Sequence, residues 1–203
     1  MKLSMHLLYL SVLVSTPAWA LFDVQVMTGK RNTTFKSSGV SEDGSGTELK
    51  AAAHLDPIPL VPIGFGISVA QTSWDKLEKS GYQKVDGFDL GLEVEAWLPL
   101  QVAGLVPYAK IGYTVAGAYA AKLSPIGGDE PSLLYKPSGL YLAAGLRWEF
   151  LLRLGVMFEV EKATRTLAFD KVTDLGSIPT GTITGKDIDA DSLSLLIGVQ
   201  AGI

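Results

Sequence analysis

Residues 87–98 alternate between apolar and polar side chains, and the same pattern recurs along most of the chain. In this stretch the even-numbered positions are apolar, while Asp89, Glu93 and Glu95 occupy odd-numbered positions. We call each such set of alternate positions a parity of the strand. Successive side chains of a strand point to opposite faces, whereas a helix would distribute the same apolar residues around its circumference. The pattern therefore predicts a strand with one apolar face and one face that carries carboxylates.

The same alternation predicts eight strands, at residues 21–35, 46–55, 63–74, 87–98, 108–119, 139–150, 154–167 and 188–203. Long polar segments follow the first, third, fifth and seventh strands, at residues 36–45, 75–86, 120–138 and 168–187, and the other connections are short or rich in proline. Roughly ten residues is the length of a tilted strand that crosses a bilayer. Short turns at one end and long loops at the other are typical of an up-and-down transmembrane barrel. The prediction is an all-β protein with a single eight-stranded antiparallel barrel.

The first 20 residues have the pattern of a secretory signal peptide. Lys2 supplies a positive charge, residues 5–14 form a short apolar core, and Ala18-Trp19-Ala20 is a small-x-small cleavage site. We therefore expect two segments, a cleaved signal peptide at residues 1–20 and the barrel at residues 21–203. A buried N-terminal helix or an uncleaved anchor is the alternative.

Composition narrows the classes of protein that fit. The chain has 203 residues, a formal net charge of −4 and no cysteine, and its mean hydropathy is +0.27. No internal run approaches the roughly 20 apolar residues of a transmembrane helix, so the hydrophobicity is spread over short segments. The absence of cysteine excludes disulfides and a lipid anchor on cysteine. An acidic balance without a clustered basic stripe argues against a nucleic-acid partner.

Alternation alone does not say which face meets lipid, because a soluble barrel such as a lipocalin has the same period with its faces reversed. Large apolar residues recur on one parity, while the other parity mixes Gly, Ala and Ser with charges. Since a narrow eight-stranded lumen needs small side chains, this asymmetry favours apolar side chains on the outside. Aromatic residues near the strand ends are interpreted as interfacial girdles: Phe22, Trp74, Tyr108, Tyr119, Trp148 and Phe150.

The segment Val-Pro-Tyr-Ala-Lys-Ile-Gly-Tyr at residues 106–113, together with the signal peptide and the eight strands, resembles the small outer-membrane β-barrel family of Gram-negative bacteria. This family comprises the OmpA-type transmembrane domain and its relatives. The resemblance implies a porin-like barrel in the cell outer membrane, with the lipid bilayer as its partner. We expect a monomer. One departure is the ending Gly202-Ile203, because members commonly end on an aromatic residue.

The polar parity then points into the lumen and carries many charges. Six charged residues fall at similar depth on four consecutive strands and form the candidate lumen network: Glu93, Glu95, Lys110, Arg147, Glu149 and Glu159. The same parity also places Glu48, Lys50, Asp89 and Glu161 inside. One hypothesis is a plug in which the two basic residues bridge neighbouring carboxylates, since isolated charges in a narrow lumen are costly. The other is an acidic, hydrated path that favours cations.

Candidate catalytic residues are sparse. Only His54 remains after signal removal, and it is predicted near the short-turn end, whereas Ser192 and Ser194 are predicted toward the long-loop end. Nucleophilic catalysis needs an imidazole within hydrogen-bond reach of the hydroxyl, so we expect no enzyme, no metal and no cofactor. The favoured function is a structural or interaction scaffold that presents four external loops. A narrow cation-leaning pore and a soluble, secreted, lipocalin-like ligand carrier are the alternatives.

Overall fold

The computed structural model describes residues 22–56, 61–75, 77, 81–98, 104–123, 131–151, 154–173 and 185–202. The predicted signal peptide lies outside these residues. The strands are β1 (Phe22–Ser37), β2 (Val40–Leu55), β3 (Ile63–Trp74), β4 (Tyr82–Trp97), β5 (Leu105–Leu123), β6 (Ser132–Leu151), β7 (Leu154–Thr173) and β8 (Ile188–Gly202).

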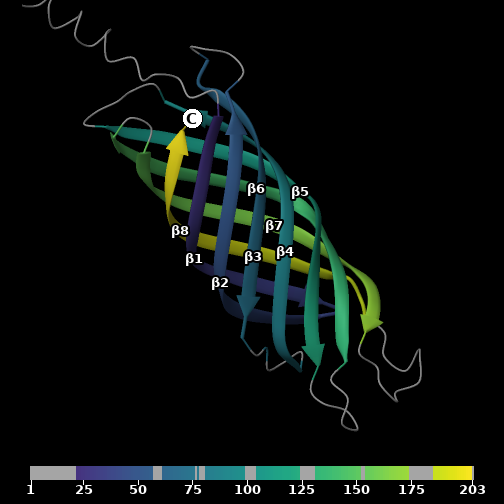
Figure 1. The fold of residues 1–203 in the computed structure, drawn as a ribbon. Helices are drawn as coiled ribbons and strands as arrows, with labels where there is room; N and C mark the ends of the chain where they lie inside the picture. Colours follow the sequence, from purple (N-terminus) through teal and green to yellow (C-terminus); the bar gives the residue numbers. More distant parts are fainter. Residues whose placement is uncertain are drawn as a thin grey trace, which may run out of the picture.

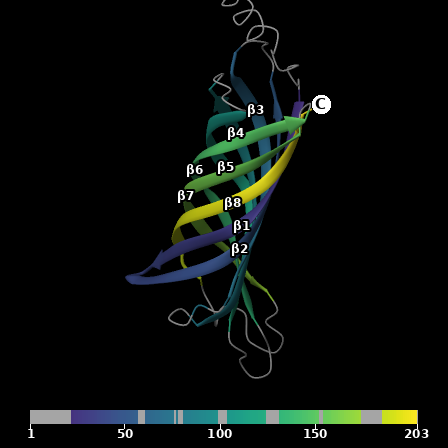
Figure 2. The ribbon, with the colours of Figure 1, turned by 90° about the vertical axis from the view of Figure 1, so that its left-hand side faces the viewer.

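All eight strands form one closed antiparallel barrel, as the sequence predicted. Each strand pairs with its neighbours in the chain, and pairing of β1 with β8, from Asp23 opposite Gly202 to Lys36 opposite Asp189, closes the ring. The strands are inclined to the barrel axis, and the end of β8 lies beside the start of β1 (Figures 1 and 2). We call this end, where β2–β3, β4–β5 and β6–β7 are connected, the turn end, and the opposite end the loop end.

The predicted boundaries agree well at the turn end; at the loop end they are confirmed for β3 and β8 and wrong for the other six strands. β2 ends at Leu55, β3 spans Ile63–Trp74 and β7 begins at Leu154, as predicted. Residues 36–45 were expected to be a long loop, but β1 and β2 are joined by the two-residue turn Ser38-Gly39, whose φ angles of 49° and 85° suit a tight hairpin. β4, β5, β6 and β7 also extend into segments predicted as loops. The barrel is therefore taller, and its first external connection far shorter, than predicted.

In the half nearer the turn end, large apolar side chains point outward. Leu92 on β4 and Leu142 on β6 are 54% and 57% exposed, whereas the neighbouring Glu93 on β4 is 3% exposed. On β6 the apolar positions span residues 140–150, which corresponds to about 25 Å along the axis at about 3.3 Å per residue and a tilt of about 40°. We call this surface the apolar belt; its members include Phe22, Val26, Leu49, Leu55, Phe65, Ile67, Phe88, Leu92, Ile111, Leu140, Leu142, Leu146, Trp148, Phe150, Phe158, Val160, Leu193, Leu195, Ile197 and Val199.

Toward the loop end the two faces exchange character. The outer wall carries polar side chains such as Lys36, Lys162 and Asp189, while the inside is filled by a cluster of apolar and aromatic side chains. We call this cluster the loop-end core; it consists of Phe35, Trp74, Leu77, Val85, Tyr119, Ala121, Leu133, Tyr135, Leu167, Ile188 and Ala190. The prediction that apolar side chains point outward and polar ones inward is therefore wrong for the loop-end half of the barrel. A wall that has water on its outside buries its apolar parity inward, as in soluble barrels.

The aromatic prediction was wrong for three of its six residues. Trp74, Tyr108 and Tyr119 are only 1%, 4% and 2% exposed and face the barrel interior, so they are not girdle residues. Trp148 and Phe150 point outward on β6, with ring centroids 6.0 Å apart. Position near a strand end was the wrong criterion. Trp74 and Tyr108 share the inward parity of their strands, and Tyr119 points inward because a register shift precedes it on β5. No helix among the described residues is long and apolar enough to span a membrane.

Candidate functional site

The lumen of the turn-end half contains a connected network of buried charged side chains, which we call the lumen network. Six of the eight strands supply its charged members, because each strand directs one parity inward. Within the described residues it comprises eight carboxylates, five Lys or Arg side chains and one histidine: Asp23, Glu48, Asp89, Glu93, Glu95, Glu149, Glu159, Glu161, Arg31, Lys50, Lys110, Arg147, Arg165 and His54.

The structure brings together all six residues that the sequence singled out. Lys110 on β5 lies 2.8 Å from a carboxylate oxygen of Glu159, 3.6 Å from one of Glu95 and 3.9 Å from one of Glu93. Arg147 on β6 lies 3.1 Å from Glu95 and 2.9 Å from Glu149. The two basic residues therefore share the carboxylate of Glu95. Glu149, with 24% of its side chain exposed, is the least buried of the six.

A second group of charges lies deeper in the barrel, toward the loop end. The Arg31 guanidinium contacts Glu48, the Asp89 carboxylate at 3.3 Å and Glu161 at 3.2 Å. Arg165 on β7 contacts the same Asp89 oxygen at 3.3 Å. Arg31 and Arg165 were not among the predicted lumen residues. Their parity would have identified them, since Arg31 shares its parity with inward-facing Asp23 and Gln25, and Arg165 with Glu159 and Glu161.

Many contacts of the network cross the lumen rather than follow its wall. Lys110 Nζ donates to Gln25 Oε1 at 2.6 Å, and Gln25 Nε2 donates to Glu95 Oε2 at 2.9 Å, which links β5 to β1 and β1 to β4. Lys50 on β2 donates to Glu159 on β7 at 3.2 Å. In an eight-stranded ring β1 and β4 are not adjacent, so these side chains fill the interior that a pore would need to leave open.

Two tyrosine side chains also fill the lumen, and each packs over a glycine of the neighbouring strand. The Tyr141 hydroxyl donates to Glu93 Oε2 at 2.8 Å, and the Tyr141 ring lies where a Cβ atom at Gly112 would be. Tyr108 donates to Glu159 Oε2 at 3.1 Å and covers Gly145 in the same way. Glycine is required at these two positions because any side chain would displace the ring, as in aromatic rescue of strand glycines.

His54 on β2 is held by carboxylates at both ring nitrogens. Its Nδ1 lies 3.1 Å from Asp23 Oδ1, and its Nε2 lies 2.7 Å from Glu93 Oε1. An ionised carboxylate only accepts hydrogen bonds, so both contacts are satisfied together when the ring carries both protons. Ser194, by contrast, hydrogen-bonds with Arg31 and Glu48, and Ser192 accepts from Arg165. The structure does not bring the histidine and these serines together.

The carboxylates outnumber the cations in this lumen, even when His54 is counted as positive. Each of the five Lys and Arg members contacts at least two carboxylates, so the cations are shared rather than paired one to one. Across the described residues, no group of three or more His, Cys, Asp or Glu side chains is arranged to hold a metal ion. The arrangement is a buried electrostatic plug with an acidic excess.

Comparison with solved structures identifies the class of fold. Neisserial surface protein A superposes with a TM-score of 0.51 and 15% identity, covering 90% of this chain and 97% of that one. A major outer membrane protein of Thermus thermophilus superposes with a TM-score of 0.51 and 15% identity, and the match covers 88% of this chain and 99% of that one. The outer membrane protease OmpT of Escherichia coli superposes with a TM-score of 0.52 and 7% identity, and the match covers 93% of this chain and 98% of that one.

The chain thus has the fold of the small outer-membrane β-barrels, which agrees with the resemblance that the sequence suggested. No protein-family model and no curated protein sequence matches the chain. At such low identities the superpositions define the architecture alone.

Proposed function

We propose that this protein is a non-catalytic barrel of the cell outer membrane that acts as a structural or interaction scaffold. The observation that carries the proposal is the combination, in one half of the barrel, of an apolar belt outside and a cross-linked lumen network inside. An outward apolar band about 25 Å tall that encircles a closed barrel is typical of a surface in contact with lipid. The loop-end half would then stand outside the bilayer, with the hairpin tip at Ser38-Gly39 at its edge. The other three predicted external loops lie largely outside the described residues.

Cell fractionation together with heat-modifiable electrophoretic mobility tests the membrane location. We expect the protein in the outer-membrane fraction, and faster migration of the unheated sample because a folded barrel resists detergent unfolding. A soluble protein without this mobility shift would contradict the proposal and would restore the soluble ligand carrier. That alternative is disfavoured by the outward direction of the belt residues, which in a soluble carrier would face the lumen.

Planar bilayer recordings test whether the lumen conducts. We expect an electrically silent barrel, since the lumen network spans the interior and the loop-end core fills the other half. The alternative, a narrow cation-leaning pore, is favoured by the acidic excess of the network. Discrete, cation-selective currents that disappear in Glu93→Gln or Arg147→Ala would establish the pore and refute the plugged scaffold.

A non-catalytic role is supported by the engagement of both His54 nitrogens with carboxylates, at a distance from Ser192 and Ser194, whose hydroxyls contact Arg165, Arg31 and Glu48 instead. A purified, folded barrel should therefore hydrolyse neither peptide nor lipid-ester substrates. Hydrolysis abolished by His54→Phe, or by Ser192→Ala or Ser194→Ala, would overturn the non-catalytic assignment.

A further inference from the structure

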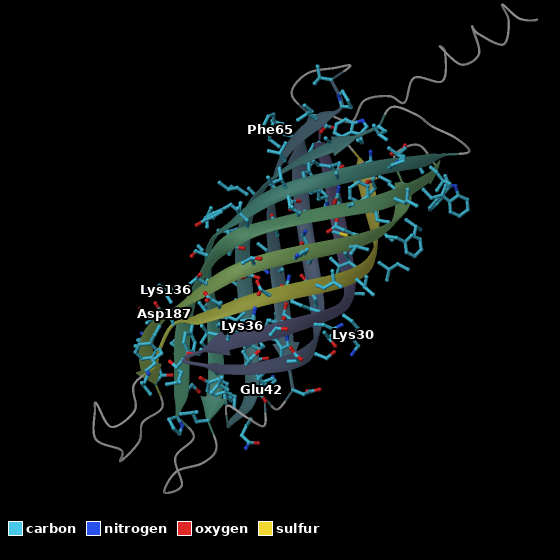
Figure 3. All side chains as sticks on the ribbon, turned by 180° about the vertical axis from the view of Figure 1, so that it is seen from behind. Lys30, Lys36, Glu42, Phe65, Lys136 and Asp187 are labelled. Carbon is cyan, nitrogen blue, oxygen red and sulfur yellow. The ribbon has the colours of Figure 1, made fainter. Side chains whose placement is uncertain are left out.

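The outer wall formed by β7, β8, β1 and β2 changes abruptly from apolar to polar along each strand. On β7 the belt residue Val160 is followed, two positions on, by Lys162, and on β1 Val26 and Thr28 are followed by Lys30. Figure 3 shows Lys30 on this wall, with Lys36 nearer the loop end. This part of the wall therefore has its first cations directly at the edge of the belt.

Lys30 and Lys162 flank a single strand. Lys30 is opposite Leu195 of β8, and Lys162 is opposite Leu193 of the same strand. Strand spacing puts their Cα atoms about 12 Å apart, so two flexible ammonium groups can converge above two exposed leucines. Within the described part of the chain neither lysine has a salt bridge, whereas Lys36 is paired with Asp191 at 2.8 Å.

Directly toward the loop end from the two lysines, the wall is hollowed by a shallow open recess. It is lined by residues of all four strands, and its outward polar side chains are those of Asn32, Thr34, Asp43, Ser45, Lys162 and Asp191. Its outward side chains are amide, hydroxyl, carboxylate and ammonium groups, which donate and accept hydrogen bonds in the manner that sugar hydroxyls require. Lys36 pairs with Asp191 at 2.8 Å and Thr34 donates to Asp43 at 2.6 Å, so both carboxylates of the recess have a partner, and only Asp191 has a cationic one.

We propose that this wall binds one phosphorylated glycolipid of the surrounding outer leaflet. Its acyl chains would lie along Leu193, Leu195 and Val160, its phosphate between Lys30 and Lys162, and its sugar in the recess. The order of the three surfaces along the wall matches the order of acyl chain, phosphate and sugar in such a lipid, and the recess is continuous with the belt through Leu193. The inference rests on the proposed membrane location.

The test uses the full-length barrel in phosphatidylcholine nanodiscs doped with bis-phosphorylated lipid A or with phosphatidylglycerol. Mass spectrometry counts the doped lipid that stays with each barrel after transfer to detergent and washing. We expect retention of lipid A over phosphatidylglycerol, and about a fivefold loss in Lys30→Gln/Lys162→Gln, in line with the removal of two ion pairs at a surface. The double variant Lys122→Gln/Lys136→Gln is the control for the loss of two positive charges elsewhere, because it removes two exposed lysines from the outer wall of β5 and β6, of which Lys136 is paired with Asp170 at 2.7 Å.

Asn32→Leu tests the recess separately and should reduce the preference for lipid A over phosphatidylglycerol. Equal losses in the test and control variants, or no loss in either, would overturn the site. Equal retention of the two lipids by the wild type would overturn the glycolipid, and displacement by inorganic phosphate would identify a free phosphate site instead. A barrel that fails to enter nanodiscs contradicts the proposed location, which separates that failure from a failure of this inference.

Discussion

At the scale of single residues, the turn end of the lumen depends on cations that are each shared between carboxylates. His54 separates Asp23 from Glu93, and Lys110 separates Glu93 from Glu159. Removing one partner of a buried ion pair costs more than the pair contributes, because the remaining charge is left buried and uncompensated. Single substitutions in the network should therefore act mainly through the charges that they leave behind.

Replacement of His54 by phenylalanine tests this reasoning. We expect His54→Phe to lower the free energy of unfolding by about 3 kcal/mol, because Asp23 and Glu93 then face each other without a cation. Urea unfolding in detergent, followed by the electrophoretic mobility shift, measures the change. The double variant His54→Phe/Glu93→Gln should recover part of the loss. An unchanged unfolding midpoint in His54→Phe would show that the imidazole is not a cation of the network.

Asp56, just beyond the end of β2, predicts a pH dependence. Its pKa is raised from 3.8 to about 6, first because the carboxyl is partly buried and then because Asp23 and Glu95 lie near it, while Arg147 and His54 oppose the shift. The folded barrel therefore binds this proton more tightly than the unfolded chain does. The resulting stability is fully present below about pH 4 and is lost as the pH rises through about 6.

The variant Asp56→Asn keeps the neutral form at every pH. Its urea midpoint should exceed that of the wild type at pH 7 and approach it at pH 4. Midpoints measured in detergent across this range, with both proteins in the same buffers, provide the check. Parallel pH profiles for the two proteins would exclude Asp56 as the titrating group.

At the scale of elements, each strand carries one pattern at its turn end and another at its loop end. β4 shows this clearly: Leu92 points outward into the belt, whereas Val85, nearer the loop end, points inward into the loop-end core. Val85 is at an odd-numbered position and Leu92 at an even-numbered one. The apolar side chains of β4 therefore change from the inward parity to the outward parity between these two residues. The position of a side chain along its strand therefore decides what a substitution costs.

Leu92→Arg places a charge in the middle of the apolar belt. We expect it to reduce the stability of the inserted barrel by ~2–4 kcal/mol if this position is at the bilayer midplane. The matched control is Ser138→Arg, an outward-facing position on β6 at the loop-end side of Leu140, which should cost little. Folding efficiency into lipid vesicles compares the two variants. Equal efficiency would contradict the assignment of the belt to lipid.

At the scale of the whole molecule, the barrel consists of two stacked halves with different interiors. Trp74 connects the parts of the loop-end core: its ring packs on Phe35 at 5.5 Å and on Tyr119 at 5.6 Å, and its Nε1 donates to Thr33 at 3.2 Å. The lumen network has its own cross-barrel bonds. The loop-end half should consequently be able to loosen without opening the other half.

Trp74→Ala tests this independence. We expect faster amide hydrogen exchange in the loop-end parts of β1 and β4 to β8, since truncating a buried tryptophan costs about 3–5 kcal/mol. Exchange near Glu93, Lys110 and Glu159 should remain slow, and the mobility shift should persist. Uniformly faster exchange over the whole barrel would show that the two halves unfold as one unit.

The sequence predicted the strand number, the closed topology and the six-residue lumen cluster, because strict alternation is preserved wherever the outer face belongs to the apolar belt. It failed where that pattern changes. Val85 and Leu133 belong to segments rich in Gly, Ser, Pro and charged residues, which resemble loops when read locally. Tyr119 lies beyond a register shift between Thr114 and Tyr119 of β5, which hides its direction from any count of parity. Contacts across the lumen, such as Gln25 with Glu95, depend on closure and have no local signal.

The exchange of faces along the wall has a consequence for what can reach the protein from outside a cell. Thr164, Thr166 and Asp189 lie on the flank of the loop-end half and are exposed there, although all three belong to regular strands. In the proposed orientation an antibody or a ligand can therefore bind the hydrogen-bonded sheet, whose shape is fixed. Its binding does not depend only on the connecting segments. Sequence changes in those connecting segments would leave this rigid epitope intact.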